Sequence, residues 1–140
     1  MKNPEEINEI KATVRVSSIS GDYGFLNARI GGAFCRDSNG EVFARVAIDG
    51  DKALYWVYTE YWDGDHLVEP SLAGESLADV TQGNDYELTL KWDEPTATFT
   101  FAVKGLNDGV DNSATYTIPG PISPIDNPRR GIGIVGWVIL

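Results

Sequence analysis

Residues 42–62, with the sequence VFARVAIDGDKALYWVYTEYW, contain two extended runs separated by an Asp-Gly pair. In the first run, apolar side chains recur at every second position, which is typical of a β-strand with one buried face. The recurring apolar set is Val42, Ala44, Val46 and Ile48. Asp49 and Gly50 both tolerate positive φ and suit a type I′ turn. The stretch therefore predicts a β-hairpin, with strands at residues 42–48 and 53–62.

Working outward from this hairpin, the same alternation or a continuous apolar run predicts further strands. They lie at residues 10–16, 25–35, 86–92, 98–104, 115–118 and 132–140. Asp93-Glu94-Pro95 turns the chain from the strand at residues 86–92 into the strand at residues 98–104, which predicts a second hairpin. Gly31 and Gly32 lie inside one strand and indicate a bulge or a close backbone approach. Residues 132–140 are apolar on both faces, as expected for a centrally placed strand.

Segments rich in Gly, Asp, Asn, Ser and Pro separate these strands, and no segment has a sustained helical period. Residues 64–82 and the proline-rich residues 119–130 are expected to be loops, and only residues 4–8 and 76–80 could form a helical turn. About eight strands at this spacing predict one all-β domain over residues 1–140, an antiparallel β-sandwich or jelly roll, with a closed barrel as the alternative. The expected core comprises Val14, Val16, Ile30, Phe34, Val46, Ile48, Leu88, Leu90, Phe99, Phe101 and Ile134.

Composition excludes several functions. The 140 residues carry a net charge of −10, which repels phosphate backbones, so we expect no nucleic-acid partner. No apolar run approaches the roughly 20 residues of a membrane-spanning helix, so we expect no membrane insertion. The polar start shows no signal peptide. One cysteine and one histidine leave no internal disulfide, Cys-based zinc cluster or His-rich metal site.

Several of these segments carry a resemblance. They are residues 10–14 (IKATV), 27–34 (NARIGGAF), 40–48 (GEVFARVAI), 86–92 (YELTLKW) and 99–101 (FTF). Together they resemble bacterial domains of the concanavalin A-like lectin/glucanase superfamily, the laminin-G-like jelly rolls, over most of residues 8–135. The resemblance implies a sandwich fold, carbohydrate binding and an extracellular location.

Two departures qualify what the resemblance implies. Such domains usually have further strands before the matched region, so we expect a shortened sandwich. Glucanases of the superfamily carry acids at alternating positions of one strand, and no Glu-x-Asp-x-Glu pattern occurs here. We therefore expect no catalytic residues and no hydrolytic activity.

The most aromatic stretch supplies the first candidate binding residues. Trp56, Tyr58, Glu60 and Trp62 share one strand face, which the glutamate marks as the wetter one, and Asp63 follows directly. Sugar rings stack on aromatic faces while carboxylates accept hydroxyl hydrogen bonds, so this row suits a glycan. Alternatively, one row packs in the core and the other covers a loop or a partner.

Arginines supply the second candidate site. Arg29 and Arg45 lie on the polar faces of their strands, as do Lys11, Arg15, Lys91 and Lys104. A locally positive sheet face suits an anionic ligand such as a uronic-acid or sulfated glycan. The alternative is ordinary cross-strand charge pairing, with the cations scattered over two sheets.

Three acidic loops, at residues 37–41, 63–66 and 107–112, could hold calcium through oxygen ligands, but Asp, Asn and Gly also dominate tight turns. We predict no metal site and no cofactor. His66 could act as a general base with Asp63 or Asp65, but no nucleophile motif accompanies it, which favours a solvated side chain. Cys35 is expected to be an inert, packed thiol.

The leading hypothesis is a non-catalytic β-sandwich module that binds a carbohydrate or another extracellular ligand. The alternative is a self-assembly module with aromatic subunit contacts. A glycoside hydrolase or lyase that uses Glu60, Asp63 or His66 ranks last. Missing strands and the uncharged residues 132–140 favour a homodimer over a monomer.

Overall fold

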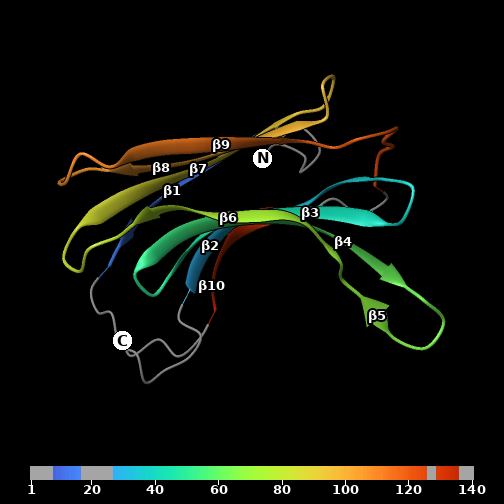
Figure 1. Ribbon diagram of the computed structural model, residues 1–140, viewed down its shortest axis with the longest axis horizontal. Coiled ribbons are helices and arrows are strands. Elements are labelled where there is room, and N and C mark those ends of the chain that lie inside the picture. Colours follow the sequence, from blue (N-terminus) through green and yellow to red (C-terminus); the bar gives the residue numbers. More distant parts are fainter. Residues whose placement is uncertain (1–7, 17–26, 126–128, 136–140) are drawn as a thin grey trace.

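The strands of this chain form two antiparallel sheets that face each other as two layers (Figure 1). The computed structural model describes residues 8–16, 27–125 and 129–135. The four-stranded sheet has the order β1 (Glu9–Arg15), β7 (Asp85–Asp93), β8 (Thr98–Gly105) and β9 (Asp111–Thr117). The six-stranded sheet runs β10 (Arg129–Val135), β2 (Asn27–Arg36), β3 (Glu41–Asp49) and β4 (Lys52–Trp62), with β5 (Leu67–Val68) and β6 (Ser71–Asp79) both paired to β4. The all-β antiparallel sandwich predicted from the sequence is confirmed.

The β3–β4 hairpin forms as the alternation predicts, with an unbroken register from Asp49 opposite Lys52 to Glu41 opposite Glu60. The turn differs from the prediction by one position. Gly50 and Asp51 form the loop, and of these two residues Gly50 alone has positive φ, at 60°. Positive φ at the first loop position is the pattern of a type II′ turn rather than type I′.

The core lies between the two sheets and contains most of the residues predicted for it. Phe101 on β8 stacks on Tyr55 of β4 with ring centroids 4.5 Å apart, and Phe34 of β2 meets Phe99 edge-on at 5.2 Å. Val14 is only half-buried, because β1 is an outer strand of its sheet. The expectation for the Ile134 side chain lies outside the described residues. Those confirmed as buried are Val16, Ile30, Phe34, Val46, Ile48, Leu88, Leu90, Phe99 and Phe101.

Three further sequence predictions are wrong. Residues 64–82 are not a loop but contain β5 and β6, and the helical turn expected at residues 76–80 lies largely within β6. Residues 132–140 were expected to form a central strand, yet β10 pairs only with β2 among the described residues and lies at the edge of its sheet. The centre is already occupied, because β3 pairs with both β2 and β4. The helical turn expected at residues 4–8 falls almost entirely outside the described residues, as do residues 136–140.

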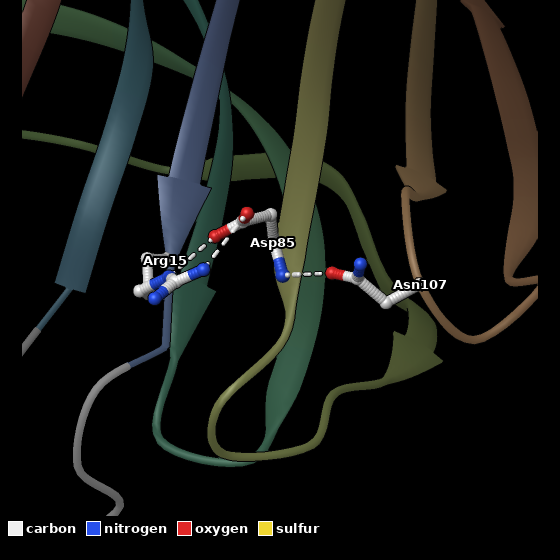
Figure 2. Close-up of polar contacts among 3 residues, drawn as sticks. All are labelled: Arg15, Asp85 and Asn107. Carbon is white, nitrogen blue, oxygen red and sulfur yellow. Dashed lines mark hydrogen bonds and ion pairs between the residues drawn. The ribbon is translucent and has the colours of Figure 1, made fainter.

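The outer face of the four-stranded sheet carries charges in cross-strand register. Arg15 donates to the two carboxylate oxygens of Asp85 at 2.8 and 3.2 Å, and the backbone N–H of Asp85 donates to Asn107 at 3.1 Å (Figure 2). Lys104 lies opposite both Glu87 and Asp111. The cross-strand pairing alternative thus holds for Arg15, whereas Lys11 pairs with Glu9 of its own strand.

No helix long and apolar enough to cross a membrane occurs in the described part of the chain.

Candidate functional site

The outer face of the six-stranded sheet brings several predicted binding residues together. Arg45 lies opposite Gly31 of β2 on one side and Trp56 of β4 on the other. Arg29 lies opposite Ala47 of β3, two positions from Arg45 along that strand. Because residues in cross-strand register point to the same face, Arg29, Arg45 and Trp56 share one surface. We call this surface, with Tyr58, Gly31 and Gly131, the arginine face.

Aromatic rings orient Arg45. Its guanidinium carbon lies 5.7 Å from the ring centroid of Trp56 and 5.3 Å from that of Tyr58. A planar guanidinium stacks on aromatic faces and keeps its N–H groups free at its edges. The contact therefore holds the cation in place while leaving hydrogen-bond donors available.

Tyr58 is less accessible than the sequence suggested. Its side chain is only 8% exposed, because its ring stacks on Phe43 at 5.1 Å and packs in a small cluster with Ala33 and Ile125. Burial raises the pKa of Tyr58, Glu69 and Glu60 raise it further, and Arg45 and Arg29 lower it. Tyr58 is thus the buried part of the arginine face, while the half-buried Trp56 remains partly exposed on it.

Arg29 is a partly buried cation beside another cation. Burial lowers its pKa, and the charge of Arg45 lowers it further. Within the described residues, neither Arg29 nor Arg45 forms an ion pair with a carboxylate. Lys52, by contrast, lies at the end of β4 and pairs with Asp79.

The remaining predicted residues lie farther along β4. Glu60 is half-buried directly opposite Glu41. Trp62 is 66% exposed and pairs in register with Leu67. Trp62 lies six positions after Trp56, which is about 20 Å of extended strand. Trp62 and Asp63 therefore belong to the β4–β5 hairpin, which bends away from the four-stranded sheet at the lower right of Figure 1, and not to the arginine face.

The acidic loops use their carboxylates to shape turns. Asp37 accepts N–H bonds from Asn39 and Gly40 at 2.8 and 3.0 Å, and Asp63 accepts two from Asp65 and His66, both at 2.9 Å. These bonds support the conformational explanation of the loop composition. In the described residues, no three His, Cys, Asp or Glu side chains cluster to hold a metal ion.

His66 and Cys35 offer little chemistry. The His66 side chain is 71% exposed and lies 3.3 Å from Asp63 at the tip of the β4–β5 hairpin. Backbone N–H donors lower the pKa of Asp63. Cys35 is buried in the core, and burial raises the pKa of its thiol to about 12. A thiol with so high a pKa is a poor nucleophile.

Sequence reasoning missed the residues that surround the arginines. Gly131 of β10 lies opposite Gly31 and adds bare backbone to the face, and Ile125 covers part of it. The glycine-rich pattern of residues 131–136 was visible in the sequence, but nothing there indicated its neighbour in the sheet. Ile125 lies in the proline-rich segment, whose path no periodicity predicts.

No family model matches the chain, and neither a curated protein nor a solved structure matches it. The placement of the residues therefore carries the functional argument.

Proposed function

We propose that this protein is a non-catalytic binding module, of the lectin-like jelly-roll type that its sequence resembles, which binds a carbohydrate on its arginine face. The observation that supports the proposal most is the Arg45 guanidinium held over Trp56 and Tyr58 on a partly open sheet surface. That arrangement combines an apolar ring with fixed hydrogen-bond donors.

The chemistry of a saccharide matches this surface. A pyranose presents C–H groups on its ring face, which pack on an aromatic ring, and hydroxyl groups at its edge, which accept hydrogen bonds. Trp56 offers the ring and Arg45 offers N–H donors beside it. Pockets that bind small ligands combine apolar lining and a few placed polar groups in the same way.

A glycan array, screened with and without calcium, tests the proposal. We expect binding to at least one saccharide class, unchanged when calcium is removed. Trp56→Ala should weaken binding to di- and trisaccharides at least tenfold. Trp62→Ala is the matched control, because Trp62 is about 20 Å away along the strand and cannot reach the same sugar. Equal losses for both variants, or no binding on the array, would contradict the proposal.

A self-assembly module remains the second candidate, and one observation favours it. Trp62 and Leu67 are 66% and 48% exposed, and they form a cross-strand apolar pair on the β4–β5 hairpin. An exposed apolar pair of this kind is often buried against another chain. Sedimentation at micromolar concentrations should show a dimer that Trp62→Ala shifts to monomer. A single 15.3 kDa species at every concentration would exclude this candidate.

Hydrolysis is the function that we expect to be absent. Glu41 and Glu60 lie opposite each other on adjacent strands, so they are the residues to test if activity is found. Carboxyl groups on either side of a glycosidic bond are what hydrolysis requires. We expect no release of reducing ends from β-glucans or polyuronates. Release that Glu60→Gln abolishes would overturn this expectation.

A further inference from the structure

Arg29 and Arg45 are diagonal neighbours on adjacent strands of one sheet face. Arg29 lies opposite Ala47, and Arg45 lies opposite Gly31, so each arginine is two positions from the other's partner. Diagonal neighbours of this kind lie about 7–8 Å apart, within reach of long side chains. At this spacing, two long arginine side chains can contact one bound group.

This pair of cations is unfavourable in the free protein. The two charges repel, and burial removes part of the water that would screen Arg29. No carboxylate among the described residues forms an ion pair with either arginine. Partly desolvated like charges without a directly paired carboxylate are expected to bind an anion, because the anion relieves the repulsion and accepts charge-assisted hydrogen bonds.

The surface beside the two arginines is exposed on its β10 side, at Gly131. Gly31 lies between Arg45 and Gly131 in cross-strand register, and Gly133 lies opposite Arg29. A Cβ atom placed on Gly131 would meet no atom within 4 Å. A ligand can therefore approach the backbone at Gly131, on the far side of Gly31 from Arg45, whereas Gly31 itself is covered by the Arg45 side chain.

We propose that Arg29 and Arg45 together hold one anionic group, a carboxylate or a sulfate ester, of an acidic saccharide whose ring packs on Trp56. This inference rests on the proposed carbohydrate function and names its ligand class. The net charge of −10 does not oppose it, because charges beyond about 8 Å are screened at physiological ionic strength whereas direct contacts are not. The specificity comes from the planar fork of each arginine, which matches carboxylate and sulfate geometry.

Isothermal titration with matched ligands tests the inference and separates the two sources of negative charge. The carboxylate probes are trigalacturonate and its methyl ester, which is neutral but otherwise alike. The sulfate probes are a chondroitin sulfate tetrasaccharide and its desulfated form. We expect esterification or desulfation of the preferred probe to weaken binding at least tenfold, the loss typical of a charge-assisted hydrogen bond.

Variants of the two arginines complete the test. Arg29→Gln and Arg45→Gln should each weaken binding of the charged probe about tenfold or more, and the double variant should lose less than the product of the single losses, because both contact one group. Arg15→Gln, the same change on the opposite sheet, is the control and should bind as the wild type does. Thermal unfolding of each variant checks that it folds.

The outcomes distinguish this inference from the proposed function. If neutral and charged probes bind equally, and both arginine variants match Arg15→Gln, the two-arginine inference is wrong. In that case, a loss with Trp56→Ala would still support the carbohydrate function. If no probe and no arrayed saccharide binds, both proposals fail.

Discussion

The two outer faces of this sandwich differ in how their positively charged side chains are paired. On the four-stranded sheet, Arg15 is paired with Asp85, and Lys104 lies between Glu87 and Asp111 in register. On the six-stranded sheet, Arg29 and Arg45 lie beside glycines and aromatic rings. Cations that pair with a carboxylate of the same sheet stabilise the fold weakly, and their charge is neutralised. Cations without such a pair are available to an anionic ligand. This contrast supports the proposal that a ligand binds on the outer face of the six-stranded sheet.

The greatest loss of stability is expected from a substitution in the core that supports both faces. Phe101 is fully buried and stacks on Tyr55 across the two sheets. We expect Phe101→Ala to lower the free energy of unfolding by about 3–5 kcal/mol through lost burial and a residual cavity. Urea melts followed by circular dichroism and by tryptophan fluorescence should shift together, because the two sheets share one core. A loss below 1 kcal/mol would mean that the inward and outward faces are assigned wrongly.

Gly31 and Gly131 lie opposite each other on the arginine face, but their surroundings differ. A Cβ on Gly31 would overlap the backbone oxygen of Ala44, whereas a Cβ on Gly131 meets open space. Gly31→Ala should therefore cost about 1–3 kcal/mol, since a backbone must shift. Gly131→Ala should be neutral or slightly stabilising, by up to about 0.5 kcal/mol, because alanine restricts the unfolded chain.

Binding gives the second readout for this pair. If Gly131 is part of the ligand's floor, Gly131→Ala should weaken binding of the charged saccharide while the melting curve stays unchanged. An unchanged affinity would place the ligand away from β10. Equal destabilisation by both substitutions would contradict the different surroundings of the two glycines.

Strict alternation explains how much of this arrangement could be predicted from the sequence. The alternation of residues 42–59 correctly predicted which side chains of β3 and β4 face the core, because the register between these two strands has no bulge. β6 was missed because its pairing with β4 shifts register twice, near Ala53 and Val57, and its Ala, Gly, Ser and Glu residues have low strand propensity. Only tertiary pairing specifies that strand.

The candidate site was predicted in part, for a related reason. The polar parity of Arg29 and Arg45 is a local property, and the sequence shows it. Their separation from Arg15 and Lys104 depends on which strands share a sheet, and strand order is not encoded in any one segment. The covering of Tyr58 by Ile125 likewise depends on a loop that returns from β9 across the other sheet.

The last prediction compares how the stability of two variants depends on pH: one loses Arg15, which pairs with Asp85, and the other loses Arg29, which has no ion pair among the described residues. The guanidinium of Arg15 lowers the pKa of Asp85 below its usual value near 4, so the pair stabilises the fold above that pH and loses this contribution as the pH falls through the lowered pKa. Arg15→Gln should therefore destabilise the protein slightly at pH 7 in urea melts, and this difference from wild type should disappear as the pH falls through the lowered pKa of Asp85. Arg29→Gln should cause no loss at pH 7, because it removes repulsion from Arg45 and breaks no carboxylate pair among the described residues. A pH-dependent loss for Arg29→Gln that matched the loss for Arg15→Gln would show that Arg29 has a carboxylate partner. The distinction between the two faces would then disappear.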